Sequence, residues 1–401
     1  MRIAALVYQF PVLSQTFVLN QITGLLERGQ SVEIFAARRG DENAAHPDVA
    51  RFQLGAHTTY YDLSPNYFAR AARALPIAAR AFRDSPVRAL AAMNVPRYGM
   101  HAASLQLLSA VNALRAHEPF DITHGHFGPN GLLGAKLRDI GALRGKLVTT
   151  FYGYDVSETR HVRAYDFLFA RGDLFLALSE TMRARLIEMG CAAQKIRVHH
   201  LGIDPALFSP APRAPRSEIR LLTIARLVPK KGIEYALRAV ARVRERFPNL
   251  RYVIVGDGVL RPALEKLIVE LRLQNCVQLA GWQTQPRVIE FLQNSDILLA
   301  PSITAPNGDA EGTPVAVLEA MAMELAVLAT RHSALPEMLT HKVSGWLVPE
   351  RDVDALAGAL ETLGASETLR TRLGKNARAV VSTQFNIHTL NDGLLDLYTS
   401  L

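Results

Sequence analysis

The chain has 401 residues, 49% of them hydrophobic, which is enough to bury the cores of two or three domains. It has no run of 18 apolar residues and only two cysteines, Cys191 and Cys276, so we expect no membrane-spanning helix, disulfide framework or cysteine-ligated metal, as in a cytoplasmic protein. The net charge is +8, and residues 1–200 carry nearly all of it, with 23 Lys and Arg against 16 Asp and Glu. That excess favours either a solvated Arg-rich surface or an anionic partner such as a membrane, whereas no motif typical of nucleic-acid binding is present.

The first half of the chain alternates short apolar, β-rich runs with helix-like segments. The apolar run at the amino-terminus is short and is followed by Gln9 and Pro11, so we interpret it as a first strand rather than a signal peptide. Strands are predicted at residues 2–8, 31–37, 121–127, 146–152, 173–179 and 196–201.

A basic helix face is predicted between the second and third of these strands, with an interruption at Pro76. On a helical projection, one face carries Arg70, Arg73, Arg80 and Arg83 and the opposite face carries Phe68, Leu75 and Phe82. This Arg-rich face is the candidate contact with an anionic membrane surface.

Two predicted strands end in residues capable of chemistry. His124 and His126 close one strand, and Tyr152, Gly153 and Asp155 follow the next. The carboxyl ends of parallel strands share one edge of the sheet, so His126, Tyr152 and Asp155 are candidate catalytic residues. Structural roles explain the same residues about equally well.

Residues 204–220, with four prolines, form the best linker candidate. Beyond it, strands are predicted at residues 219–225, 251–256, 276–281, 296–300 and 326–330. Near-continuous apolar strands separated by helices indicate parallel sheets covered on both faces. The sequence therefore predicts an α/β fold of two Rossmann-like, doubly wound domains that face each other across a cleft.

Two cations follow the first strand of the second half. Arg226 ends the strand, and Lys231 comes just before Gly232 and the next helix. Such a pair at the carboxyl end of a sheet's strands suits a diphosphate, although surface charge explains either residue alone. The next strand ends in GDG, but Arg261 replaces the third glycine of a dinucleotide fingerprint, so a tight turn is the better interpretation.

The stretch EGTPVAVLE, residues 311–319, places two glutamates around the start of a helix. Thr313 is a good N-cap and Pro314 suits the first helical position, so Glu311 is expected in the loop and Glu319 inside the helix. Amides at such a turn are free to face an anion. Those amides belong to Gly312, Thr313, Val315 and Ala316.

Together these residues resemble the retaining, nucleotide-sugar-dependent glycosyltransferase family 4 ("group 1"), whose fold is GT-B. The resemblance covers nearly the whole chain and rests on HHLGIDPALFSP, TIARLVPKKGIEYAL, VIVGDGVLRPALE, VQLAGW, SDILLAPSITAPNGDAEGTPVAVLEAMA and SGWLVPERD. The opening FPVLSQTFVLNQITGLLERGQSVEIFA is similar to members that build exopolysaccharides and capsules.

The resemblance implies roles for the candidate residues. Arg226 and Lys231 would bind the donor diphosphate, Glu319 the ribose hydroxyls and Glu311 the transferred sugar. The amide turn would hold phosphate and sugar, and the base would lie near Trp282 and Gln283. The implied substrate-binding set is Arg226, Lys231, Trp282, Gln283, Gly312, Thr313, Pro314, Val315 and Glu319.

The resemblance also implies the domain plan. Residues 1–203 would form the acceptor-side domain, 204–217 the linker and 218–382 the nucleotide-sugar domain, with a helix in 383–401 crossing back to the first domain. The chain departs from the family pattern at four positions. Tyr152 replaces a common His, Gln15 a common Glu, and Glu324 and Ala326 a common Gly and Pro.

We therefore expect a retaining hexosyltransferase that moves a sugar from a UDP- or GDP-sugar to a glycan, such as a lipid-linked exopolysaccharide or capsule intermediate, at the cytoplasmic face of the membrane. No cofactor or metal is expected, because the one Asp-x-Asp, Asp352 and Asp354, suits a helix start. The alternative is a nucleotide-sugar epimerase on the same fold. The broken glycine fingerprint disfavours a dinucleotide-dependent oxidoreductase, and the set of Glu311, Arg226 and Lys231 disfavours a non-catalytic binding protein.

Overall fold

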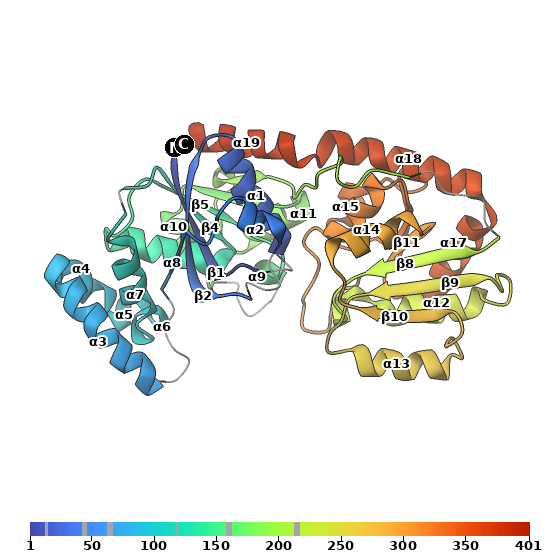
Figure 1. Cartoon of the computed structure of the whole chain (residues 1–401), viewed down its shortest axis with the longest axis horizontal. Helices are drawn as coiled ribbons and strands as arrows, with labels where there is room; N and C mark the ends of the chain where they lie inside the picture. Colours follow the sequence, from blue (N-terminus) through green and yellow to red (C-terminus); the bar gives the residue numbers. More distant parts are fainter. Residues whose placement is uncertain (13–14, 42–45, 62–66, 118, 158–162, 212–216) are drawn as a thin grey trace.

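The computed structural model of the chain describes residues 1–12, 15–41, 46–61, 67–117, 119–157, 163–211 and 217–401. These residues form two domains, each built around one parallel sheet (Figure 1). This arrangement confirms the predicted pair of Rossmann-like domains. Among the described residues, no helix combines the length and the hydropathy needed to cross a membrane.

The amino-terminal sheet has seven parallel strands in the order β3-β2-β1-β4-β5-β6-β7. They are β1 (Arg2–Phe10), β2 (Ser31–Arg39), β3 (Thr58–Tyr60), β4 (Ile122–His126), β5 (Lys146–Thr150), β6 (Leu174–Ala177) and β7 (Ile196–Val198). The edge strand β3 was not predicted, because its three half-buried residues carry no apolar run. The strand order reverses between β1 and β4, which places the ends of β4 and β5 beside a topological switch point.

The carboxyl-terminal sheet has six parallel strands in the order β10-β9-β8-β11-β12-β13. They are β8 (Ile219–Ile224), β9 (Leu250–Val255), β10 (Val277–Gly281), β11 (Ile297–Ala300), β12 (Ala326–Thr330) and β13 (Trp346–Val348). Strand β13 was also missed, since it has only three residues.

Helices cover both faces of each sheet (Figure 1). The helices of the amino-terminal domain are α1 (Thr16–Glu27), α2 (Pro47–Arg51), α3 (Tyr67–Asp84), α4 (Pro86–Ala92), α5 (Val95–Tyr98), α6 (Met100–Ala103), α7 (Gln106–Leu114), α8 (Gly128–Asp139), α9 (Tyr154–Ser157), α10 (Asp166–Arg171), α11 (Glu180–Glu188) and the 3-10 helix η3 (Ala193–Lys195). Those that follow are the 3-10 helix η4 (Pro229–Lys231), α12 (Ile233–Val243), α13 (Arg261–Glu270), α14 (Gln285–Gln293), α15 (Val315–Ala322), α16 (Leu335–Met338), α17 (Val353–Ala365), α18 (Glu367–Gln384) and α19 (Ile387–Thr399).

Both faces of each sheet are buried, which explains the near-continuous apolar strands. Along β1, Ile3 and Ala5 belong to one hydrophobic cluster, and Ala4 and Leu6 belong to another on the opposite face. Strand β12 divides its residues between two clusters in the same way. Successive strand residues point to opposite faces, so a strand covered on both sides has no polar alternation.

Helices α3 to α6 form a lobe at the end of the amino-terminal domain that lies farthest from the other domain (Figure 1). The predicted interruption at Pro76 is wrong, because α3 runs without a break from Tyr67 to Asp84. The alanines around Pro76 favour helix strongly enough to tolerate the lost backbone donor. Arg80 and Arg83 of the predicted basic face are exposed, whereas the side chains of Phe68 and Arg73 lie outside the described part.

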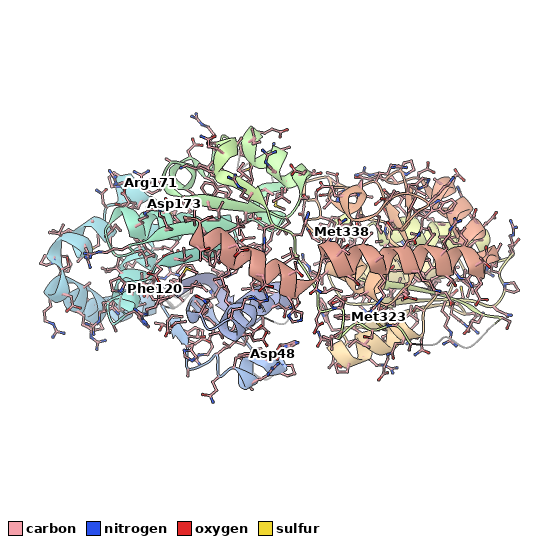
Figure 2. The ribbon with its side chains drawn as sticks, turned by 90° about the horizontal axis from the view of Figure 1, so that it is seen from above. Asp48, Phe120, Arg171, Asp173, Met323 and Met338 are labelled. Carbon is pink, nitrogen blue, oxygen red and sulfur yellow. The ribbon has the colours of Figure 1, made fainter. Side chains whose placement is uncertain are left out.

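The end of the chain returns to the first domain, where α19 packs on α1 (Figures 1 and 2). The junction is fixed by two backbone hydrogen bonds, from Ile203 N–H to the Phe385 carbonyl at 3.0 Å and from Ile387 N–H to the Ile203 carbonyl at 2.9 Å. Gly24 on α1 lets α19 approach, since a β-carbon there would lie 1.8 Å from Nδ2 of Asn391. The helix thus holds both domains to one another.

Candidate active site between the domains

Glu311 lies in the loop between β11 and α15, and its side chain is buried, with 7% exposure. Lys231 Nζ lies 2.6 Å from Glu311 Oε1, and the Ser302 hydroxyl donates to the same oxygen at 3.4 Å. Burial alone would raise the pKa of Glu311, but Lys231 and then Lys230 lower it below its ordinary value. The carboxylate is therefore ionised at neutral pH and paired with a cation.

The backbone of Glu311 is fixed by residues that the sequence did not single out. Its N–H donates to His332 Nε2 at 3.0 Å, and its carbonyl accepts from the Ser333 hydroxyl at 2.6 Å. Because Nε2 accepts, the His332 proton lies on Nδ1, which is 2.6 Å from Glu350 Oε1. His332 comes just after β12, so the signal that could have found it was a histidine at a strand end.

A second lysine supports the same loop. Lys230 is buried and donates to Asp309 Oδ1 and to the Ala310 carbonyl, both at 3.0 Å. The turn that carries the two lysines requires glycine at 232, where φ is +59° and a β-carbon would lie 2.0 Å from the Pro301 carbonyl oxygen. Lys230 therefore holds the chain just before Glu311, while Lys231 faces the carboxylate.

Helix α15 begins one residue later than predicted. Pro314 is its N-cap and Val315 its first residue, so Thr313 is not the cap. The Thr313 hydroxyl is instead buried, and within the described chain it has no hydrogen-bond partner. The first-turn amides of Val315 and Ala316 still point out of the open end of the helix, next to Gly312, as an anion site requires.

Glu319 lies one turn inside α15 and borders a crevice of about 150 Å³ between the domains. Thr16 and Asn20 of α1 line the other side of this crevice. Burial raises the pKa of Glu319 to about 7. Unlike Glu311, this carboxyl has no cation beside it in the described structure.

The amino-terminal candidates form a buried polar chain at the ends of β4 and β5. The Tyr152 hydroxyl lies 2.8 Å from His126 Nδ1 and 3.3 Å from Gln21 Oε1. His126 stacks on His124, whose two ring nitrogens contact the hydroxyls of Thr150 and Tyr398, one each. Burial raises the pKa of Tyr152 well above its ordinary value and lowers that of His126 to about 3. Both side chains are therefore neutral at pH 7.

Asp155 braces the loop after β5. One carboxylate oxygen accepts from the backbone N–H groups of Tyr152 and Gly153 at 2.9 and 3.1 Å, and the other accepts from Gly128 at 2.8 Å. Burial raises the pKa of Asp155, and these backbone donors oppose that rise. Its oxygens are occupied by the backbone, so the structure favours a positioning role over contact with a substrate.

Gly153 and Gly312 bring the two halves of the site together. Gly153 has φ +116°, and a β-carbon there would lie 2.8 Å from the Gly312 nitrogen. In return, a β-carbon on Gly312 would lie 2.3 Å from the Tyr152 carbonyl oxygen. The loop after β5 therefore touches the chain beside Glu311, and only glycine fits on either side.

The remaining predicted residues lie at the ends of their strands, and within the described structure their side chains make no hydrogen bond or ion pair with this cluster. Arg226 follows β8 and is exposed, and its guanidinium has no partner in the described chain. Trp282 follows β10 and is 58% exposed. Gln283 folds back and donates to the Ala280 carbonyl at 2.7 Å. These three residues are available to a ligand but are not organised around one.

Two other predictions from the sequence are confirmed as structural features. In the GDG turn, the Asp257 side chain accepts from Gly258 N–H at 2.7 Å and binds Arg261 Nη1 at 3.1 Å. Asp352 caps α17 by accepting from Ala355 N–H at 2.8 Å. Among the described residues, no group of three or more His, Cys, Asp or Glu side chains is arranged to hold a metal ion.

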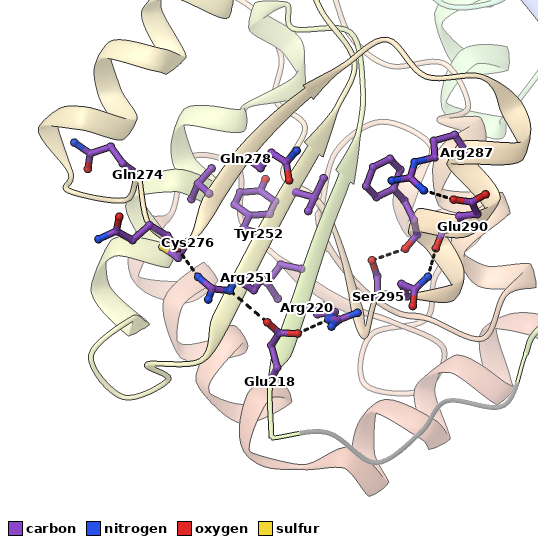
Figure 3. A pocket seen from close by; sticks show the side chains of 16 residues that line it. Glu218, Arg220, Arg251, Tyr252, Gln274, Cys276, Gln278, Arg287, Glu290 and Ser295 are labelled. Atoms are coloured by element: carbon purple, nitrogen blue, oxygen red, sulfur yellow. Dashed lines mark hydrogen bonds and ion pairs between the residues drawn. The ribbon is translucent and has the colours of Figure 1, made fainter.

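A hollow of about 470 Å³ in the carboxyl-terminal domain contains none of the predicted site residues (Figure 3). It lies between α14 and the strands β8 to β10, toward their amino ends. Each of its charged side chains has a partner inside the hollow, where Glu218 binds both Arg220 and Arg251, and Arg287 binds Glu290. Ligands of parallel sheets bind beyond the carboxyl ends of the strands, so this hollow is not the candidate active site.

Two family descriptions match successive parts of the chain. Glycosyltransferase Family 4 matches residues 14–207, and Glycosyl transferases group 1 matches residues 208–380. The chain is 37% identical over 410 residues to WcaL of Escherichia coli (strain K12), a glycosyltransferase assigned to colanic acid biosynthesis, with 100% of each chain covered. It is 38% identical over 395 residues to the amylovoran biosynthesis glycosyltransferase AmsK of Erwinia amylovora, with 97% of each chain covered.

The fold is similar to that of Anabaena HepE, whose structure was solved in complex with UDP and glucose. The TM-score is 0.75 at 19% sequence identity, with 100% of both chains covered. At that identity the likeness concerns the fold alone. With its two parallel-sheet domains, the two matching family descriptions and relatives of equal length at 37 and 38% identity, the chain belongs to glycosyltransferase family 4, group 1, with the GT-B fold.

Proposed function

We propose that this glycosyltransferase moves a hexose from a UDP- or GDP-sugar to a glycan acceptor, with retention at the anomeric carbon. The observation that carries the proposal is the buried Lys231–Glu311 pair, at 2.6 Å, beside the open start of α15. An anion site, a cation and a carboxylate thus converge where Gly153 of the other domain touches Gly312. The relatives named for colanic acid and amylovoran biosynthesis support an exopolysaccharide intermediate as the acceptor.

The donor would fit this arrangement in one orientation. Its diphosphate would lie at the first-turn amides of α15, with Lys231 and the exposed Arg226 as cations. Glu311 would then accept hydrogen bonds from the hydroxyls of the sugar, and Glu319 from those of the ribose. The base would reach the exposed Trp282 beyond β10. Anabaena HepE, which was solved with UDP and glucose, supports this general placement through its fold.

Charge stabilisation would supply most of the catalysis. As the bond between sugar and phosphate breaks, negative charge grows on the diphosphate and positive charge on the sugar ring. Lys231 would be shared between Glu311 and the diphosphate, so Glu311 would become available to the sugar when the donor binds. Tyr152, His126 and Asp155 would hold the Gly153 loop against Gly312 and form the amino-terminal-domain side of the sugar pocket. They would not exchange protons with the substrate.

We also propose that the diphosphate is bound without a metal ion. Lys231 and Arg226 both follow β8 and, with the first-turn amides of α15, can balance the charge of the leaving group, whereas Lys230 is already paired with Asp309. Turnover after dialysis against EDTA should equal turnover with added Mg²⁺ or Mn²⁺. A loss restored by either ion would contradict this part of the proposal.

The acceptor side would face an anionic membrane through the lobe of α3 to α6. Arg80 and Arg83 are exposed there, and Leu75 on the same helix is 73% exposed. Basic and apolar side chains on one exposed helix are typical of interfacial contact. The galactosyltransferase of Escherichia coli that acts on GlcNAc-diphosphoundecaprenol, 25% identical over 348 residues, supports a lipid-linked acceptor.

The test is nucleotide release from a panel of UDP-, GDP- and ADP-sugars, with and without a lipid-linked glycan acceptor. We expect one donor to release its nucleotide rapidly only with the acceptor, and the product to keep the anomeric configuration of the donor by NMR. Release that is independent of any acceptor, with a free epimerised sugar, would identify the epimerase alternative. Inversion in the product would contradict retention while leaving transfer intact.

A further inference from the structure

A second hollow lies at the base of the helical lobe and has a volume of about 550 Å³. It is enclosed by the corner between α3 and α4, the end of α7 and the loops that precede β4 and β5. Phe120, one of its lining residues, is labelled at the base of the lobe in Figure 2. The hollow therefore lies at the amino ends of β4 and β5, whereas His126 and Tyr152 lie at their carboxyl ends. It is separate from the candidate active site.

Three arginines surround this hollow, and only one of them is neutralised by a described neighbour. Arg115 binds Asp84 Oδ2 at 2.7 Å. Arg88 on α4 is half-buried and Arg144 before β5 is exposed. Neither of these two guanidinium groups has a partner in the described part of the chain. The described lining thus carries two uncompensated positive charges, which attract an anion.

The hollow also offers neutral hydrogen-bonding groups. The side-chain oxygen of Asn112 is buried and lacks a partner among the described residues. A buried amide without a partner is costly, and a hydroxyl of a bound molecule would satisfy it. Ser85 adds a hydroxyl at the start of α4. Guanidinium groups beside an amide and a hydroxyl suit a phosphate ester of a polyol better than a bare anion.

The helix that brings Arg88 to the hollow also exposes apolar side chains to solvent. Val87 and Leu90, which flank Arg88 on α4, are 78% and 62% exposed. Six of the fourteen exposed large apolar side chains in the described chain fall within residues 75–100. They are Leu75, Val87, Leu90, Met93, Val95 and Met100. Such a cluster marks a contact surface.

We propose that this hollow binds the phosphate headgroup of an anionic phospholipid while the exposed apolar side chains of the lobe enter the surface of the bilayer. Arg88 and Arg144 would bind the phosphate, and Asn112 a hydroxyl of the headgroup. The exposed apolar side chains of the same lobe favour a lipid over a soluble phosphate ester of the same chemistry. This inference rests on the proposed membrane contact of the lobe, but it does not depend on the proposed chemistry at Glu311.

The test compares two double variants that lose the same charge from the same lobe. Arg88→Gln/Arg144→Gln removes the two arginines of the hollow that have no partner among the described residues, and Arg80→Gln/Arg83→Gln removes two arginines outside it. Binding is measured by flotation with phosphatidylcholine vesicles whose negative charge comes either from phosphatidylglycerol or from the same amount of oleate. Calorimetry with glycerol 3-phosphate reports on the hollow without a membrane, and thermal unfolding checks that each variant folds.

We expect the wild type and the Arg80/Arg83 variant to bind phosphatidylglycerol vesicles about tenfold more tightly than oleate vesicles, through charge-assisted contacts to phosphate. The Arg88/Arg144 variant should lose that preference and its binding of glycerol 3-phosphate. Equal affinity of the wild type for both kinds of vesicle, or the same preference in both variants, would overturn the proposal and leave only diffuse surface charge. Turnover with a detergent-solubilised acceptor should be unchanged in both variants, so a failure of the catalytic proposal would be seen separately.

Discussion

Arg226 and Lys231 are both proposed to bind the diphosphate, but the structure makes them very different as test sites. Lys231 is the partner of the buried Glu311, so Lys231→Met would leave a buried carboxylate unpaired and cost about 3–5 kcal/mol of stability. Loss of activity in that variant would not identify a ligand contact. Arg226 is exposed and unpartnered in the described chain, so its removal disturbs no described contact.

We therefore expect Arg226→Gln to leave the melting temperature unchanged and to weaken binding of the nucleoside diphosphate by about 2 kcal/mol, or roughly 30-fold. Affinity for the matching nucleoside, which lacks the phosphates, should change less than about twofold. Calorimetry with both ligands measures the difference, and Arg238→Gln on α12, also exposed, is the matched control. An equal loss of affinity for nucleoside and nucleotide would mean that Arg226 contacts the base or supports the fold instead.

The two glutamates of the site should affect different kinetic parameters. Glu311→Gln removes a charge that would oppose the developing positive charge on the sugar, so it should lower kcat by about 100-fold, equivalent to ~3 kcal/mol. Glu319 would bind the ribose, which is the same in substrate and transition state, so Glu319→Gln should chiefly raise KM. Steady-state kinetics at saturating acceptor separate the two effects. A variant of Glu311 that changes only KM would refute this division.

The pKa of Glu319 adds a pH dependence to that comparison. Burial raises this pKa to about 7, so the carboxyl of the free enzyme is protonated below pH 7 and resembles glutamine. The kcat/KM of the wild type should fall below pH 7 toward the value of Glu319→Gln, while the profile of the variant stays flat in that range. A similar fall in the variant would assign the transition to another group.

At this scale, sequence predicts the residues that chemistry requires and misses those that hold them. The spacing of Glu311 and Glu319 could be recognised in the sequence because both lie in one short stretch, a loop and the helix that follows it. His332 and Ser333 follow β12 and hold the backbone of Glu311, while Glu350 follows β13 and contacts His332, and no local pattern links these residues to Glu311. Only the strand order β11-β12-β13 brings them together.

At the scale of elements, the loop after β5 and the loop before α15 meet through two glycines. Gly153→Ala would add a β-carbon 2.8 Å from the Gly312 nitrogen, in a backbone conformation with φ +116° that alanine disfavours. The loops must then separate, so we expect kcat to fall by about 10- to 100-fold, since small misplacements of reacting groups are costly. Gly190→Ala is the control, because φ there is +96° but the space is open. If both substitutions lower kcat equally, backbone strain alone would explain the result, and the contact between the two loops would not be needed.

The lobe is attached to the domain through Asp139 at the end of α8. This carboxylate accepts from Arg97 at 2.8 and 3.1 Å, from the Tyr98 hydroxyl at 2.7 Å and from Arg171 at 2.9 Å. Arg97 chiefly, with Tyr98 and Arg171, holds the pKa of Asp139 well below its usual range against the effect of burial. A lowered pKa in the folded state means that the stabilisation is complete above the unfolded pKa, near 4, and is lost as the pH falls below it.

Asp139→Asn should therefore be less stable than the wild type at pH 7, and the gap should shrink as the pH falls from about 5 to 3. Urea unfolding of both proteins at several pH values measures the gap. Asp166→Asn, at an exposed ion pair with Arg163, is the control and should show little difference at any pH. A gap that stays constant with pH would mean that the charge of Asp139 contributes nothing to stability.

Element boundaries were less predictable than the elements themselves. Thr313 has the right chemistry for a cap, but α15 begins after Pro314, and the preceding Gly312 packs against Tyr152 and Gly153 of the other domain. Pro76 has the right chemistry to end a helix, yet α3 continues through it. Local preferences of about 1–3 kcal/mol are overridden when neighbouring residues and packing favour the alternative.

On the scale of the whole molecule, two contacts join the domains in addition to the one between Gly153 and Gly312. Helix α19 crosses back and buries Tyr398 against His124. The other contact was not predictable from sequence. Glu337 on α16 accepts from the backbone N–H groups of Glu180 and Thr181 at 2.7 and 3.0 Å, and from the Thr181 hydroxyl at 2.7 Å. These amides are the first two of α11, so a carboxylate of one domain occupies the helix start of the other.

A carboxylate at a helix start contributes about 1 kcal/mol, so Glu337→Ala should shift the ratio of closed to open arrangements about fivefold toward open. Because α19 remains in place, we expect the domains to rotate about the junction near Ile203 rather than to come apart. Small-angle scattering should show a larger radius of gyration, and KM for the donor should rise, since the donor would bind between Gly153 and Glu311. Glu361→Ala, which breaks an ion pair with Arg246 inside one domain, should change neither quantity. If Glu337→Ala and Glu361→Ala scatter alike and bind the donor alike, the contact at α11 is incidental and α19 alone sets the domain arrangement.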